Sequence, residues 1–205
     1  MTAWKITTAP AAEPLLLADV KNYLKVPSAV TADDDLITGY IREAREFVER
    51  KTARALITQT VTQYLDKWPD TTDKNPRVIC PHIAPVQSVT SIKYVASDGT
   101  PATYTLWDNT SNEKYFLDNT SGMTGIGPAR IVKNPDVNWP DLADYLNAVE
   151  LVYVAGYGAA GSAVPGPLLT AMRRLIGAWY YGRKGSFTDD WNMVGDLLDP
   201  YKVHK

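Results

Sequence analysis

The sequence is poor in the residues from which metal and redox sites are built. Among its 205 residues there are one cysteine, Cys80, and two histidines, His82 and His204. One cysteine excludes a disulfide framework within the chain. A zinc site of His and Cys ligands needs three or four residues at suitable spacing, and Cys80 with His82 supplies only two. We therefore expect no metal site and no cofactor.

The sequence also lacks the signatures of membrane insertion and of common enzyme classes. No stretch reaches the roughly 18 apolar residues that a membrane span requires, and residues 1–14 show no basic region followed by an apolar run, as a secretory signal would. There is no phosphate-binding Walker loop, dinucleotide fingerprint, nucleophile elbow or H-E-x-x-H motif. We expect a protein that is not an enzyme and does not cross a membrane.

An excess of charge of one sign is absent as well. The 21 basic and 23 acidic residues give a net charge of −2, which argues against a protein that clamps duplex DNA by neutralising many phosphates. Aromatic and basic residues are nevertheless interleaved at two places, which leaves nucleic-acid binding as an alternative to an ordinary half-buried sheet and a solvated helix face. The candidates are Lys93, Tyr94, Tyr104, Trp107, Arg173, Arg174, Arg183 and Lys184.

Apolar periodicity predicts three helices, over residues 15–25, 33–55 and 165–181. The second is the clearest, because its apolar residues recur every three or four positions. Asp33, Asp34 and Asp35 lie at its start, and we interpret them as charges that complement the positive end of the helix dipole. A divalent-metal site is the alternative, but the ligand spacing of a calcium loop is missing.

From Ile57 the period changes to two, which predicts a β-rich block over residues 57–155. Asp98-Gly99 inside this block is typical of a tight hairpin turn. The pattern favours an α+β fold in which the N-terminal helices and one long C-terminal helix pack together, with the β-rich block inserted between them. We expect one domain over residues 1–184 and a tethered arm over residues 185–205.

The arm is the strongest indication of function. After Gly182 the sequence contains a short segment with too many apolar residues to remain exposed to water. It has too few residues to build a core of its own. Such a segment on a tether is typical of a partner-binding element; the alternative is that it folds back onto its own domain. Its apolar residues are Trp191, Met193, Val194, Leu197, Leu198, Pro200 and Tyr201.

An ordered series of segments resembles one family. EPLLLADVKNYLKV and the stretch from DDDLITGYIREAREFVERKT to QYLDKWP open the series. PHIAPVQSVTSIKYVASDGT, NAVELVYVAGYGAAGSAVPGPLLTAMRRLIGAWYYGR and LLDPYKV continue it. Together they resemble, over essentially the whole chain, the head–tail connector (adaptor) proteins of tailed bacteriophages and gene transfer agents.

The resemblance implies a structural virion protein, made in the bacterial cytoplasm and located in the neck. Such proteins form a ring, commonly of twelve copies, beneath the portal protein. The ring extends the DNA channel, through which double-stranded DNA passes without specific binding, and offers a platform to the next neck or tail protein. The arm would then bind the portal. A tail-completion or stopper protein and a DNA-packaging accessory that binds DNA are the alternatives.

The resemblance also implies contacts between neighbouring copies. Charged residues on the polar faces of the second and third long helices are candidates for ion pairs across a head-to-tail interface. Solvated helix faces are the equally weighted alternative. The candidates are Arg42, Arg45, Glu46, Glu49, Arg173 and Arg174.

Overall fold

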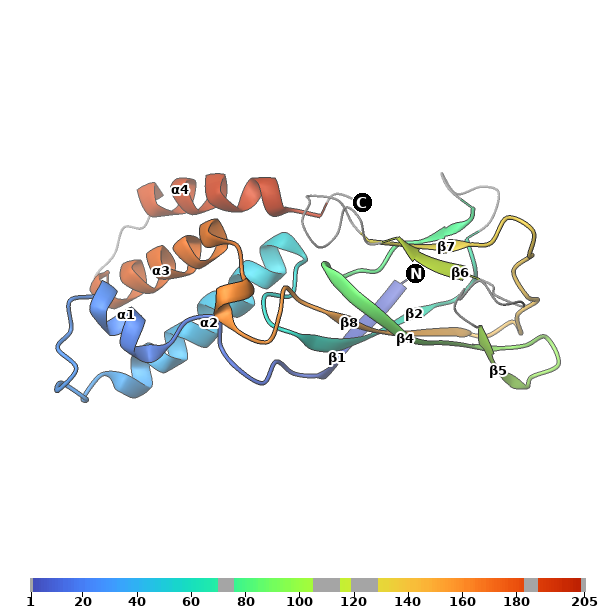
Figure 1. The fold of residues 1–205 in the computed structure, drawn as a ribbon, viewed down its shortest axis with the longest axis horizontal. Coiled ribbons are helices and arrows are strands. Elements are labelled where there is room, and N and C mark those ends of the chain that lie inside the picture. The colour runs from blue at the N-terminus through green and yellow to red at the C-terminus, as the bar shows by residue number, and fades with distance from the viewer. Residues whose placement is uncertain (1, 70–75, 105–114, 119–128, 183–187, 204–205) are drawn as a thin grey trace. The chain divides into compact units, whose positions relative to one another are not determined.

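The computed structural model describes residues 2–69, 76–104, 115–118, 129–182 and 188–203, without the side chains of residues 2 and 188–192. The chain divides into two compact units (Figure 1). The β unit comprises residues 1–9 and 59–156, and the helical unit comprises residues 10–58 and 157–205. Each unit is therefore built from segments that are far apart in the sequence.

Two antiparallel sheets form the β unit. The strands are β1 (Thr2–Thr8), β2 (Gln59–Leu65), β3 (Val78–Ile79), β4 (Val86–Val95), β5 (Pro101–Tyr104), β6 (Tyr115–Asp118), β7 (Arg130–Lys133) and β8 (Val149–Ala155). The larger sheet has the order β1-β2-β8-β4-β5, and the smaller one β3-β7-β6. In the central strand β8, Val149, Leu151, Tyr153 and Ala155 are buried at every second position. This is the pattern of period two from which strands are predicted.

An aromatic cluster of Trp68, Tyr94, Tyr104, Tyr115 and Trp139 lies inside the β unit. The rings of Trp68 and Trp139 stack with their centroids 4.6 Å apart, and Tyr104, which is 1% exposed, contacts both. Both indole N–H groups donate to main-chain carbonyls at 2.9 Å. Burial raises the pKa of Tyr115 to about 12, because the charged phenolate loses its hydration there.

In its described residues the helical unit has four helices and two single turns. They are α1 (Leu17–Tyr23), α2 (Asp34–Thr52), the turn η1 (Gly161–Ala163), α3 (Gly166–Tyr181), α4 (Thr188–Leu198) and the turn η2 (Asp199–Tyr201). One hydrophobic core holds them together, with residues from every α-helix. None of the helices in the described part of the chain is long and apolar enough to span a membrane.

Helix α2 is the longest element of the helical unit, and its sequence explains its bounds. Ile37, Ile41, Ala44 and Val48 are fully or almost fully buried, and their spacing of four, three and four residues places them on one face. The helix ends at Thr52 because Ala53 adopts a left-handed conformation, with φ of 54°. That reversal turns the chain back into the core.

The two ends of the long β insertion meet inside the helical unit. Thr58 N–H donates to the Gly158 carbonyl at 2.9 Å, and Tyr157 N–H donates to the Leu56 carbonyl at 3.3 Å. Ile57 and Gly158 also form a parallel β-bridge. The helical unit is thus continuous across residues 58 and 157.

The predicted α+β class is confirmed. The three predicted helices and the β-rich block correspond to α1, α2, α3 and the run from β2 to β8. Two features differ from the expectation. The N-terminal strand β1 was not predicted, and the described part of the C-terminal segment belongs to the helical unit instead of forming a separate arm.

Candidate functional site

The C-terminal segment, residues 188–203, packs on its own helical unit. Val194 is 1% exposed and Leu198 is 2% exposed, and both belong to the core of that unit. Leu197 and Tyr201 are partly buried against the same core. Helix α4 contacts α3 and α2, so one side of the segment is fully used within the chain.

Two main-chain anchors fix the end of the segment. Val203 N–H donates to the Thr52 carbonyl at 3.0 Å. The Arg54 Nε donates to the Tyr201 carbonyl at 2.6 Å, and Arg54 Nη1 donates to the Tyr157 hydroxyl at 3.1 Å. Arg54 is completely buried, so these hydrogen bonds replace water around its guanidinium group.

In the single chain the segment is therefore not the tethered arm that we expected. The structure shows the alternative, in which the segment folds back onto its own unit. The physical reason is that α2 and α3 leave an apolar strip that Val194 and Leu198 cover. Met193, 43% exposed, and Pro200 remain on the surface. The side chain of Trp191 lies outside the described residues. Whether the segment binds a portal stays a prediction.

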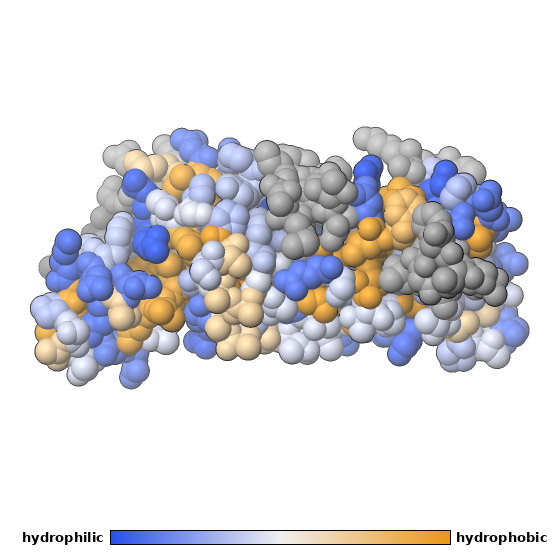
Figure 2. Space-filling view, in the orientation of Figure 1, coloured by the Kyte–Doolittle hydropathy of each residue, from blue (hydrophilic) through white to orange (hydrophobic). Residues whose placement is uncertain are grey.

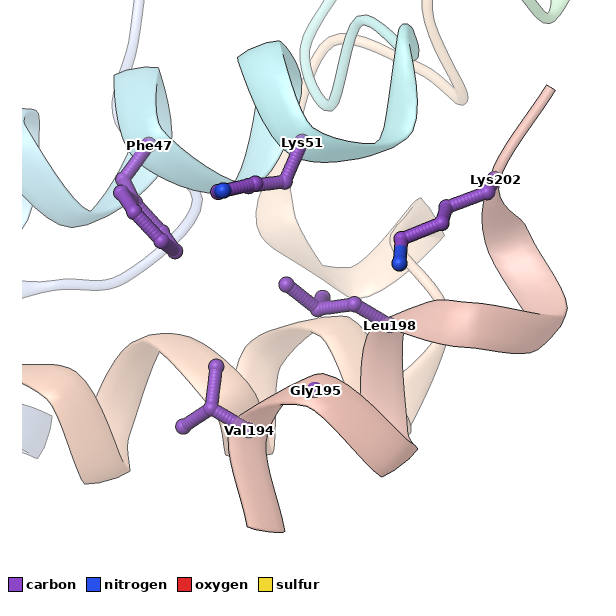
Figure 3. Close-up of a pocket in the computed structure, with 6 residues that line it drawn as sticks. All are labelled: Phe47, Lys51, Val194, Gly195, Leu198 and Lys202. Carbon is purple, nitrogen blue, oxygen red and sulfur yellow. The ribbon is translucent and has the colours of Figure 1, made fainter. Parts of the chain in front are cut away.

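A groove of about 320 Å³ opens between α2 and α4 (Figure 3). Phe47 and Lys51 come from α2, while Val194, Gly195 and Leu198 come from α4 and Lys202 follows the turn η2. The Lys51 Nζ lies 5.7 Å from the centroid of the Phe47 ring, a cation–π distance. The groove is thus apolar at its floor and positively charged at its rim.

The charged residues of α2 form a network within the chain. Arg45, only 6% exposed, donates from Nε to Glu13 Oε2 at 2.8 Å and from Nη1 to Glu49 Oε2 at 2.9 Å. Glu46 lies 3.6 Å from Arg45 Nη2. Glu49 Oε1 also accepts the Leu56 N–H at 2.8 Å. The network joins α2 to the chain before α1 and to the turn after α2.

Burial raises the pKa of the Glu49 carboxyl above its ordinary value, although the Leu56 N–H and the charge of Arg45 act in the opposite direction. For Arg45, burial acts to lower the pKa, but the hydrogen bond with Glu13 and the charges of Glu49 and Glu13 outweigh it and raise the pKa. Arg45 and Glu49 thus have partners inside the chain. A role of the six candidates at an interface between copies stays a prediction.

Among the described candidates for nucleic-acid binding, the two aromatic residues do not form a stacking surface. Tyr104 is buried and Tyr94 lies edge-on to Trp68 in the aromatic cluster. Trp107, Arg183 and Lys184 lie outside the described residues. Within the described ranges no group of three or more His, Cys, Asp or Glu side chains is arranged to hold a metal ion. The His82 ring stacks on Trp4 instead, with centroids 5.0 Å apart.

The sequence did not indicate Arg54 as a site residue, and the helix predicted over residues 33–55 includes it. Arg54 lies two residues beyond the last residue of α2 and directly before the buried Ala55, Leu56 and Ile57. A charged residue next to an apolar run is a signal of a buried, hydrogen-bonded group. Its acceptor, Tyr201, cannot be identified without the fold.

Comparison with known proteins relates the fold to one kind of particle. No protein-family model matches the chain, and no curated protein matches it. A chain in the neck of an empty GTA particle, computed with C6 symmetry, is 22% identical, with a TM-score of 0.76, over 99% of this chain and 96% of that one. A chain in the virion of a native gene transfer agent (GTA) is 23% identical, with a TM-score of 0.76, over 98% and 96%.

A third similar chain, in the neck of the native GTA particle computed with C12 symmetry, is 22% identical, with a TM-score of 0.73, over 99% of this chain and 96% of that one. The correspondence covers almost the entire length of both chains in each case. It therefore includes the helical unit with its C-terminal segment as well as the β unit. This chain has the fold of a protein found in the necks of gene transfer agent particles.

Proposed function

We propose that this chain is a structural virion protein of the neck, a head–tail connector that forms a ring under the portal of a tailed-phage-like particle. One observation supports this above all: the match to two chains of GTA necks extends over 99% of this chain and 96% of theirs. Those necks were computed with C6 and C12 symmetry, which is consistent with a cyclic arrangement of copies.

In this proposal the protein works by assembly and not by catalysis. The ring joins the portal above to a neck or tail protein below and extends the channel for double-stranded DNA. The near balance of 21 basic and 23 acidic residues suits a channel component, because strong phosphate binding would hinder the passage of DNA.

Particle assembly without the chain tests the function. We expect filled heads without attached tails when the chain is missing, and recovery of tailed particles when purified chain is added. Tails that attach normally in its absence would refute the proposal. A neck reconstruction that places the chain below another ring, out of contact with the portal, would instead favour the stopper role.

The portal-binding role of the C-terminal segment is a second part of this proposal. In the single chain, Met193 and Pro200 are exposed, so the segment can engage a portal through these residues without leaving its place or can move as a whole. Met193→Asp tests the contact, since it adds a charge at an exposed position and spares the core. We expect weaker portal binding; a neck reconstruction with residues 188–203 touching no other chain would overturn this part.

A further inference from the structure

We propose that the groove between α2 and α4 binds the acidic, apolar N-terminal end of α2 of a second copy. The inference rests on the proposed ring and adds the surface through which neighbours meet. It is carried by two patches of the helical unit that complement each other in charge and that both expose apolar side chains.

The first patch is the groove itself. Among the residues that the structure describes, Lys51 has no carboxylate partner, and its ammonium group lies over the Phe47 ring. Lys202 pairs with Asp199 at 2.5 Å, but both side chains are well exposed, 41% and 60%. In Figure 3 Lys51 lies on the α2 wall and Lys202 follows the end of the α4 wall, with Leu198 between them. A ligand that fits carries an apolar side chain beside a carboxylate.

Gly195 gives the groove its depth. It lies within α4, where glycine is less favourable than alanine by about 0.5–1 kcal/mol. A Cβ added there would meet nothing within 4 Å, so no neighbouring atom of the described chain requires a glycine. Its effect is a notch in the helix surface that allows another backbone to approach closely.

The second patch is the start of α2 with the loop before it. Asp33 accepts a hydrogen bond from the Tyr180 hydroxyl at 2.7 Å, and Asp34 pairs with Lys21 at 2.6 Å. Asp35 is exposed and has no partner among the described residues. Leu36 and Val30 next to it are 37% and 44% exposed. Apolar surface on this side of the helical unit is visible among hydrophilic residues (Figure 2).

The two patches cannot meet within one chain. Asp35 and Lys51 lie near opposite ends of one 19-residue helix, about 24 Å apart at 1.5 Å per residue. A contact between different patches of identical copies is heterologous, and such contacts close into rings when the rotation permits. The local helix dipole accounts for an Asp at one end and a Lys at the other, but not for the exposed Val30 and Leu36 or for the notch at Gly195.

Charge reversal with rescue tests this contact in the full-length chain. Lys51→Glu and Asp35→Lys should each lower incorporation into necks about tenfold or more, because like charges then face each other. The double variant should recover incorporation. Gly195→Leu should also block it while keeping the chain folded, since the new side chain fills the groove.

Arg50→Glu and Glu43→Lys are the matched controls, because both residues are exposed on α2 outside the groove. The contact is overturned if Lys51→Glu is incorporated to the same extent as Arg50→Glu, or if the double variant stays defective. Either result leaves the connector function intact. Wild-type chain that joins no neck at all would refute the proposed function instead. Normal self-association of Lys51→Glu with lost neck binding would assign the groove to another protein and also overturn the inference.

Discussion

At the scale of single residues, Arg54 connects the two ends of the helical unit. It follows α2 in sequence, and it donates to the carbonyl of Tyr201 near the end of the chain. Because Arg54 is completely buried, no water can replace it as the donor to its acceptors. Arg54 therefore helps to fix the position of the C-terminal segment from 147 residues away in sequence.

Replacing this side chain should loosen the segment. Arg54→Met keeps much of the volume but leaves the Tyr201 carbonyl and the Tyr157 hydroxyl without their donor. We expect a loss of about 2 kcal/mol in the free energy of unfolding, since hydrogen bonds from a charged donor contribute about 1.5–3 kcal/mol. Urea denaturation followed by circular dichroism measures it. The exposed Arg50→Met should change stability by less than about 0.5 kcal/mol; equal effects of the two would contradict the role of Arg54.

Glu49 should make the helical unit less stable as the pH rises. Its pKa is raised in the folded protein, chiefly by burial, so the folded state holds the proton more tightly than the unfolded state does. That contribution is complete below the ordinary carboxyl pKa and is lost as the pH rises through the raised value. The stability of wild type relative to Glu49→Gln should fall over this window. A difference that is constant or grows with pH would contradict the assignment.

At the scale of elements, α4 is part of the core of the helical unit. Val194 and Leu198 complete the apolar surface of α2 and α3. The expectation of one domain over residues 1–184 with a tethered arm implies that removal of residues 186–205 leaves a folded domain. The structure instead indicates that this deletion uncovers the core and removes the acceptor of Arg54. Substitutions at exposed positions are therefore the cleaner way to test binding by the segment.

Leu198→Ala should measure how strongly α4 is held. Truncating a buried leucine costs about 2–5 kcal/mol, and Leu198 is 2% exposed, so we expect a loss in this range by chemical denaturation. Met193→Ala on the same helix, 43% exposed, should change stability by less than about 0.5 kcal/mol. A Leu198→Ala chain as stable as wild type would show that α4 leaves its site readily.

The elements differ in how far the sequence predicts them. Helix α2 is predictable because one amphipathic stripe, Ile37 to Val48, repeats over several turns. Strand β1 is not, because its residues 3–8 are all exposed and its order comes from pairing with β2, more than 50 positions away. The apolar content of α4 is visible in the sequence, but whether it covers its own helices or another chain depends on a strip built by α2 and α3.

The sequence predicts the candidate site only in part, because here too the contacts depend on the fold. Residue type and helical spacing are enough to place Arg45 and Glu49 on α2 and to identify them as charged. Their burial and their partners, Glu13 and the Leu56 N–H, depend on how the segments before α1 and after α2 fold back. Periodicity within one helix contains no information on those contacts.

At the scale of the whole molecule, the helical unit should be separable from the β unit. Of the residues from 59–156 that the structure describes, none belongs to its core, and the hydrogen bond between Thr58 and Gly158 holds the two cut ends together. A chain in which a short Gly-Ser linker joins residues 10–58 to 157–205 should fold into a helical protein with a cooperative thermal transition. Circular dichroism during heating checks the transition, and NMR spectra of the amide groups check the fold. A molten product that unfolds without cooperativity would contradict the prediction.

The interleaved order of the two units also affects the biosynthesis of the chain. On the ribosome the last strand of the larger sheet, β8, is complete at Ala155, whereas the core of the helical unit still requires α3 and, at its end, Leu198. The apolar faces of α1 and α2 therefore emerge early and wait through the synthesis of the β unit before their covering helices exist. During that interval the nascent polypeptide exposes the stripe from Ile37 to Val48. This is the kind of apolar segment that chaperones bind.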